Sequence, residues 1–214
     1  MSSPPVTLRS AISLIFIGTL AAATAQPAEP VWKTFDPSGY SQRITACDRL
    51  AGHPEDPFKV VAGLEVPDMD LPAAIDICRK DSAGDPENPR LQYQLGRVLT
   101  YAGRSKEAMP HLQNAAVAKY PQALFVLGYL HAEGFAGVTK DTCKAASYLR
   151  EAGQYGRMAG MLALPAYALE GRFRGCESAP DSAEIAAFLT EAKSRNPSFA
   201  AGLLIDALQR AQTN

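Results

Sequence analysis

Residues 121–156 read PQALFVLGYLHAEGFAGVTKDTCKAASYLREAGQYG, and this stretch decides the fold. Leucine and alanine recur in it at helical spacing, and glycines separate two such runs. Apolar residues that recur every three or four positions predict an amphipathic helix, and glycine is typical of a helix end. The stretch therefore predicts two helices joined by a glycine-containing loop, with Cys143 at the start of the second helix.

The same pattern continues over residues 89–214 and predicts a repeat architecture. Its markers are two sets of leucines, one within each first helix and one at the end of each second helix. The first set is Leu95, Leu127 and Leu164, and the second set is Leu112, Leu149 and Leu189. The steps are 32 and 37 residues in the first set, and 37 and 40 residues in the second. A period in this range predicts stacked helix pairs, so we expect an all-α fold.

Residues 123–156 resemble a Sel1-like repeat, because they follow its pattern A-x-x-x-LG-x-x-Y-x-x-G-x-G-V-x-x-D-x-x-K-A-x-x-Y-x-x-x-A almost throughout. The preceding unit resembles a tetratricopeptide repeat. Its matching small and apolar positions are Leu95-Gly96, Gly103, Ala108, Leu112 and Ala115. The resemblance implies a right-handed α-solenoid of antiparallel helix pairs, with one tetratricopeptide-like unit and two Sel1-like units.

Two positions depart from the repeat pattern. His131 stands where the Sel1-like family usually has tyrosine, and Pro165 replaces the glycine of the Leu-Gly pair in the third unit. Proline removes a helical hydrogen bond and disfavours helical dihedrals in the residue before it. We therefore expect the helix around Pro165 to be kinked or split.

The first 25 residues predict a secretory signal peptide. Arg9 precedes the apolar run AISLIFIGTLAA, and Ala23 and Ala25 occupy the small-residue positions of a cleavage site before Gln26. The run is shorter than the roughly 20 residues that a membrane-spanning helix needs, so we expect no membrane anchor in the mature chain. Removal of residues 1–25 leaves 20 basic and 22 acidic residues. This balance gives no reason to expect binding to nucleic acid or to an anionic membrane.

The remaining chain divides into four predicted parts. They are an irregular leader over 26–40, an N-terminal helical module over 41–85, the repeats over 86–195 and a C-terminal capping helix over 196–214. Trp32 and Phe35 in the leader are expected to pack onto the body. The module is expected to contain two helices, over 42–52 and 70–84, with Asp70 as the N-cap of the second.

Four cysteines predict two disulfides in an oxidising compartment, with three possible connectivities. Zinc is the alternative, but the chain has neither C-x-x-C pairs nor a cluster of histidines. Cys47 and Cys78 lie in two helices joined by one loop, and Cys143 and Cys176 lie in neighbouring units of the expected solenoid. We therefore predict the bridges Cys47–Cys78 and Cys143–Cys176.

The sequence contains none of the motifs of common catalytic or nucleotide-binding sites, such as G-x-S-x-G, the P-loop or H-E-x-x-H. Glu107 and His111 lie four residues apart on one helix, which is more often a solvated pair than a catalytic one. The residues Glu65, Asp68 and Asp70 lack the spacing of an EF-hand. We therefore predict no catalytic, cofactor or metal site. Some cysteine-rich Sel1-like proteins are credited with β-lactam binding or hydrolysis, so a small secreted hydrolase or β-lactam-binding protein is the alternative.

In tetratricopeptide-type solenoids the first helix of each pair lines a concave face, and the resemblance carries this role to the first two units. The predicted partner-binding residues are Arg90, Tyr93, Arg97, Tyr101 and Tyr129. Charged side chains are seldom buried, so we expect Arg90 and Arg97 to be exposed. We predict an exported scaffold that binds a protein or a carboxylate-bearing peptide, as an adaptor or regulator in the bacterial periplasm or outside the cell.

Overall fold

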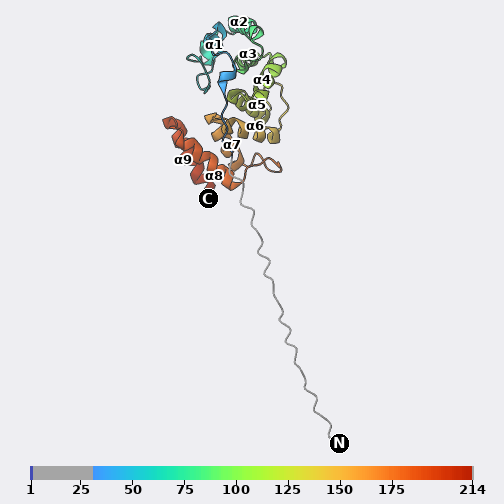
Figure 1. The fold of residues 1–214 in the computed structure, drawn as a ribbon, viewed down its shortest axis with the longest axis vertical. Helices are drawn as coiled ribbons and strands as arrows, with labels where there is room; N and C mark the ends of the chain where they lie inside the picture. The colour runs from blue at the N-terminus through green and yellow to red at the C-terminus, as the bar shows by residue number, and fades with distance from the viewer. Residues whose placement is uncertain (2–30, 214) are drawn as a thin grey trace.

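The computed structural model describes residues 31–213 together with Met1, and it is all-helical over this range (Figure 1). The predicted signal peptide and the start of the leader lie outside the described residues, apart from Met1. The α-helices are α1 (Ala46–Ala51), α2 (Leu71–Gly84), α3 (Pro89–Tyr101), α4 (Ser105–Val117), α5 (Pro121–Glu133), α6 (Thr142–Gln154), α7 (Met158–Leu169), α8 (Ser182–Ser194) and α9 (Phe199–Thr213). Two short 3-10 helices, Pro37–Gly39 and Val66–Asp68, lie in the N-terminal third.

Aspartate side chains start several of these helices. Asp70 accepts a hydrogen bond from the backbone N–H of Ala73, as predicted for α2. Asp141 caps α6 and Asp181 caps α8 in the same way, at 2.9 and 2.8 Å. Each cap satisfies a backbone N–H that has no partner inside the helix, so these residues fix where the helices begin.

The helices follow one another in space in the order of the chain. Each helix from α3 to α8 packs against the next, while α1 and α2 pack against α3 and α9 packs against both α7 and α8. Figure 1 shows this succession, with α1 and α2 at one end and α8 and α9 at the other. Consecutive packing gives the molecule a layered core instead of one central cluster.

Two glycines make the same close contact in successive helix pairs. A Cβ on Gly96 of α3 would lie 2.7 Å from Cδ2 of Leu112 on α4. A Cβ on Gly128 of α5 would lie 2.8 Å from Cδ2 of Leu149 on α6. Such distances are too short for real side chains, so glycine is what allows each leucine to pack against the facing helix.

We expected a kink or a split at Pro165, and the split is wrong, because α7 runs without interruption from Met158 to Leu169 with Pro165 inside it. The close approach in this part of the molecule lies nearer the start of the helix. A Cβ on Gly160 would lie 2.7 Å from the backbone nitrogen of Gly153 on α6. The tight contact between these helices therefore does not depend on a glycine at position 165.

Both predicted disulfides are present, Cys47–Cys78 and Cys143–Cys176, and no cysteine in the described residues is free. The first bridge joins α1 to α2. The second joins α6 to the segment between α7 and α8. Two disulfides are typical of a protein that folds in an oxidising, extracellular-type environment.

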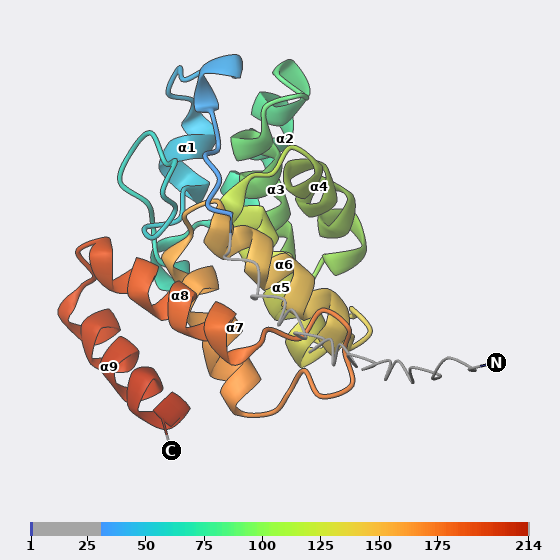
Figure 2. The ribbon, with the colours of Figure 1, turned by 60° about the horizontal axis from the view of Figure 1, so that its bottom comes forward.

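Residues 31–43, which we call the N-terminal strap, cross several helix layers. Trp32 packs against Phe188 of α8 with ring centroids 5.1 Å apart, and the N–H of Lys33 donates to the carbonyl of Gln154 at 2.9 Å. Phe35 packs edge-on against Tyr120, which precedes α5. The predicted packing of Trp32 and Phe35 onto the body is thus confirmed. Figure 2 shows the strap in blue, running from the side of α6 toward α1.

Helix α1 is shorter than the predicted helix over 42–52. It begins at Ala46 because Thr45 caps it, in a reciprocal pair of hydrogen bonds with Asp48. Residues 41–44 lie outside the helix, and the carbonyls of Ser41 and Arg43 accept hydrogen bonds from Arg90. A local cap and a tertiary contact therefore act together at the start of this helix.

Candidate functional site

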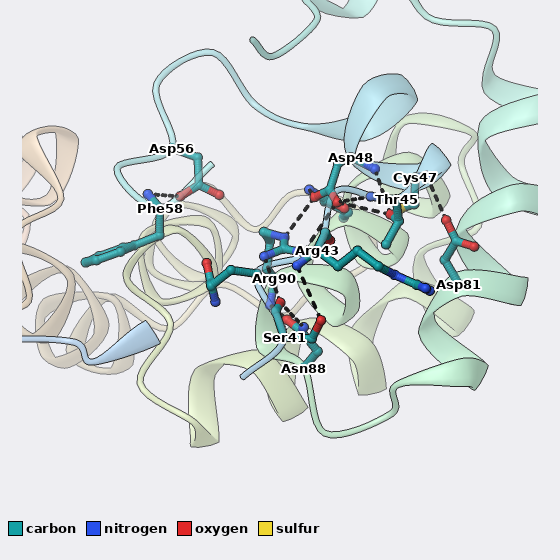
Figure 3. A network of polar contacts seen from close by, with 12 residues as sticks. Ser41, Arg43, Thr45, Cys47, Asp48, Asp56, Phe58, Asp81, Asn88 and Arg90 are labelled. Carbon is teal, nitrogen blue, oxygen red and sulfur yellow. Dashed lines mark hydrogen bonds and ion pairs between the residues drawn. The ribbon is translucent and has the colours of Figure 1, made fainter. Parts of the chain in front are cut away.

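Arg90 is buried, which makes its predicted exposure wrong. Only 3% of the residue is accessible to solvent. Its Nε donates to Asp48 Oδ1 at 2.8 Å, and its terminal nitrogens donate to Asp48 Oδ2 and to the carbonyls of Ser41 and Arg43 (Figure 3). Gln94 donates to the same carboxylate at 2.9 Å. Asp48 is fully buried. Because Asp48 lies in α1 and Arg90 in α3, their ion pair joins the N-terminal module to α3.

Arg97 and Tyr93 are buried as well, at 4% and 1% exposure, so the predicted exposure of Arg97 is also wrong. The terminal nitrogens of Arg97 donate to the carbonyls of Ala51, Gly52 and Leu64 at 2.7 to 3.1 Å. The N-terminal module therefore covers the face of α3 that the repeat pattern assigns to a partner. A buried cation needs hydrogen-bond acceptors, and here backbone carbonyls provide them.

The loop over residues 52–64 is held in place by a buried carboxylate. Asp56 accepts a hydrogen bond from the Tyr120 hydroxyl at 2.7 Å. Burial raises the pKa of Asp56, and the hydrogen bond from Tyr120 opposes that rise. The loop also folds tightly on itself, because a Cβ on Gly63 would lie 2.3 Å from the carbonyl carbon of His53. His53 is therefore presented by a fixed backbone.

Arg157 is as deeply buried as Arg90 but is not satisfied. It lies directly before α7 and is 4% exposed. Its Nε has no hydrogen-bond partner among the described residues. Its Nη1 lies 3.8 Å from Glu55 Oε2, which is too far for a hydrogen bond, and the Glu55 side chain is 70% exposed. Burial lowers the pKa of Arg157.

His53 lies near the positive charges of three basic side chains. Burial lowers its pKa to about 4, and the charges of Arg97, Arg157 and Lys59 contribute in that order. The backbone N–H of Glu55 donates to His53 Nδ1 at 2.9 Å. In the neutral ring the proton is therefore on Nε2, which leaves Nε2 as a hydrogen-bond donor.

Aromatic side chains border both arginines. The guanidinium of Arg97 lies 5.3 Å from the ring centroid of Tyr101, and that of Arg157 lies 5.3 Å from the ring centroid of Phe125. Tyr129 lies one helical turn after Phe125 on the same side of α5. Tyr101 is 43% exposed and Tyr129 is 44% exposed. We call this surface the arginine face, and its residues are His53, Arg97, Tyr101, Phe125, Tyr129 and Arg157.

The structure thus divides the five residues predicted to bind a partner. Tyr101 and Tyr129 are accessible, whereas Arg90, Tyr93 and Arg97 are not. Of the five residues, only the two tyrosines expose a large part of their side chains, and Arg90 and Arg97 already donate to acceptors of the chain.

The possible acid–base pair does not form. Glu107 accepts hydrogen bonds from Arg79 and from Arg104, both at 2.7 Å. His111 Nδ1 lies 2.7 Å from Gln92 Oε1, and burial followed by the charge of Arg79 lowers the pKa of His111. The two side chains are engaged with other residues and not with each other.

A broad depression of about 950 Å³ is lined by none of the residues of the arginine face. It is lined by the start of α4 and by residues 135–138 of the loop between α5 and α6. His131 also lines it, with Nδ1 buried and without a hydrogen-bond partner among the described residues. The arginine of this depression, Arg104, is paired with Glu107. Its positive charge is therefore already compensated, unlike that of Arg157.

Comparison with protein-family models, with curated proteins and with solved structures found no match for this chain. Over the residues that the structure describes, no helix has the length and apolar character needed to cross a membrane. The same residues contain no group of three or more His, Cys, Asp or Glu side chains that could hold a metal ion. The site must therefore be judged from its own geometry.

Sequence reasoning missed His53 and Arg157. Both lie in loops, and neither belongs to a motif or to the periodic pattern of a helix. They belong to one surface only because the N-terminal module folds back onto the later helices. The sequence contains one weak signal for Arg157, a basic residue in the short turn YGRMA between two apolar helices.

Proposed function

We propose that this protein is an exported repeat scaffold that binds a protein or peptide, as an adaptor or regulator in the bacterial periplasm or outside the cell. In this proposal α3–α8 form one tetratricopeptide-like unit and two Sel1-like units of a right-handed solenoid. The equivalent contacts of Gly96 with Leu112 and of Gly128 with Leu149 support the assignment of the first two units.

The observation that carries the proposal is the arginine face. Tyr101 is exposed and lies against Arg97, and Tyr129 is exposed one helical turn after Phe125. Phe125 lies against Arg157, a buried arginine whose Nε has no hydrogen-bond acceptor among the described residues. Tyrosine supplies a large contact area at low entropic cost, and tyrosine and arginine are enriched among residues that dominate binding energy. The engagement of Glu107 and His111 with other residues favours binding over catalysis at that pair.

Affinity capture tests the proposal. The mature protein is immobilised, exposed to periplasmic extract of the producing bacterium, and the retained proteins are identified by mass spectrometry. We expect the double variant Tyr101→Ala/Tyr129→Ala to lose the retained partner without a change in the helical circular dichroism spectrum. Truncation of an interface anchor typically weakens binding by about 2 kcal/mol or more.

The control is Phe199→Ala, which removes an aromatic ring that is 83% exposed on α9. We expect this variant to retain the partner. A partner that is kept by the tyrosine double variant and lost with Phe199→Ala would place the binding surface on α9 and overturn the assignment to the arginine face.

A further inference from the structure

Arg157 poses a problem that the protein alone does not solve. A buried guanidinium normally donates to carboxylates, carbonyls or ordered water, because an unsatisfied buried charge is strongly unfavourable. Arg90 follows this rule with acceptors from the same chain, and so do the terminal nitrogens of Arg97, although Arg97 Nε also has no partner among the described residues. Arg157 is 4% exposed and its Nε has no partner among the described residues. An unsatisfied group of this kind is explained when the missing acceptor belongs to a ligand.

We propose that the Arg157 guanidinium binds a carboxylate of the ligand, with His53 as a second donor, and that this carboxylate displaces Glu55. The inference rests on the proposed function, because it specifies the chemistry of the ligand that the arginine face receives. It names a point of attachment that the exposed tyrosines do not provide.

The surroundings of Arg157 favour a carboxylate over a phosphate. A planar guanidinium can donate two parallel hydrogen bonds to a carboxylate, and the neutral ring of His53 adds a donor without a charge. Asp56 is buried and its charge acts on Arg157, and Glu55 lies at the edge of the site. These acidic groups repel a dianion more than a monoanion. Arg97 contributes only its charge, since its terminal nitrogens already donate to backbone carbonyls.

Glu55 already shows that a carboxylate can approach this position. Its Oε2 lies 3.8 Å from Nη1 of Arg157, while most of its side chain remains in solvent. At this distance the pair gains charge attraction but no hydrogen bond. A ligand carboxylate that comes closer would gain both, so Glu55 acts as a weak internal competitor for the same guanidinium.

Direct titration of the mature protein tests the site. The probes are glutarate, its neutral diamide glutaramide, and inorganic phosphate, each followed by the Nε–Hε resonance of Arg157 in a ¹⁵N-correlated NMR spectrum. We expect glutarate to shift this resonance saturably, glutaramide to leave it unchanged, and phosphate to bind more weakly than glutarate. An unchanged resonance at saturating glutarate, or tighter binding of phosphate than of glutarate, would overturn the proposal.

Three variants add an independent readout, with glutarate affinity measured by isothermal titration calorimetry because Arg157→Met lacks the Arg157 resonance. Arg157→Met should weaken glutarate binding by about tenfold or more, the factor that corresponds to loss of a charge-assisted hydrogen bond. Glu55→Gln should strengthen it by about two- to fivefold, the factor that corresponds to a surface ion pair. A gain in affinity does not arise from misfolding, so this variant protects the test if Arg157→Met fails to fold. Arg104→Met, at an arginine paired with Glu107, is the matched control and should leave the affinity unchanged.

The outcomes separate this inference from the proposed function. Saturable glutarate binding at Arg157 without any captured protein supports the carboxylate site and counts against the scaffold. A captured protein whose affinity is the same for wild type and Arg157→Met, with no response of Arg157 to glutarate, supports the scaffold and overturns the carboxylate site.

Discussion

Arg90 and Arg157 are buried to the same degree, at 3% and 4% exposure, yet their surroundings differ completely. Arg90 has a bidentate carboxylate and two backbone carbonyls, all within 3.3 Å. Arg157 has a single carboxylate at 3.8 Å and an aromatic ring. The first arrangement joins two parts of the fold. The second leaves capacity for hydrogen bonding unused, and that is the property expected of a binding residue.

The largest expected effect on stability is at Arg90, whose hydrogen bonds are satisfied. Arg90→Met should lower the free energy of unfolding by about 3–5 kcal/mol, because it leaves the fully buried Asp48 without its counter-charge. Chemical denaturation followed by circular dichroism measures the change. Arg79→Met, at an arginine with 40% side-chain exposure, serves as the control and should change stability by less than about 1 kcal/mol. A small effect of Arg90→Met would mean that the Asp48 network is not essential to the fold.

The Cys47–Cys78 bridge lies next to this network and should rank second. Replacement of both cysteines by alanine should cost about 3–4 kcal/mol in the loop-entropy model, for a sequence separation of 31 residues. The Cys143–Cys176 bridge spans 33 residues and should cost a similar amount. Chemical denaturation of both double variants measures the two losses in the free energy of unfolding. A much larger loss at Cys47–Cys78 would show that the bridge also holds the Asp48 network together.

Replacement of Arg157 should have a small effect with the opposite sign. Arg157→Met removes a buried charge that makes no hydrogen bond, and an apolar side chain of similar length can fill its place. We expect a stability within about 1 kcal/mol of wild type, on the stabilising side. Parallel denaturation of Arg90→Met and Arg157→Met tests the contrast directly. A loss of several kcal/mol at Arg157 would assign it a structural role like that of Arg90.

The last prediction concerns pH. His53 has its pKa lowered from 6.5 to about 4 in the folded protein, so the folded state binds fewer protons than the unfolded state in this interval. Its stabilising contribution is complete above pH 6.5 and is lost as the pH falls toward 4. Arg97, Arg157 and Lys59 act on the ring, and Glu55 contacts it through the backbone. The stability of wild type should therefore fall more steeply than that of His53→Gln between pH 6.5 and 4, measured by denaturation at each pH. Parallel curves would exclude this linkage.

Local features were predictable from the sequence. The glycines and leucines of the first two units, the aspartate cap of α2 and both disulfide pairings follow from spacing and from residue type. These features involve residues close in the chain or in neighbouring units. Short-range rules of helix capping and periodicity are sufficient for them.

The environment of the arginines was not predictable in this way. Burial of Arg90 depends on Asp48, which lies 42 residues earlier, and on two backbone carbonyls that have no sequence signature. Arg97 depends on carbonyls alone. The expectation that charged residues lie at the surface is sound on average, and it fails where another segment supplies acceptors. The same long-range folding gathers His53 and Arg157.

The N-terminal strap has a consequence for how the molecule unfolds. Stacked helix repeats interact mainly with their nearest neighbours, so such arrays can fray from one end while the rest stays folded. Here Trp32 touches α8, Lys33 is bonded to the end of α6, and the carbonyl of Ser41 accepts from Arg90 on α3. Unfolding of the helices at either end breaks a contact of the strap, and the strap then holds the remaining helices less firmly. Local fraying is thereby coupled across the helix layers, and the chain should melt as one cooperative unit.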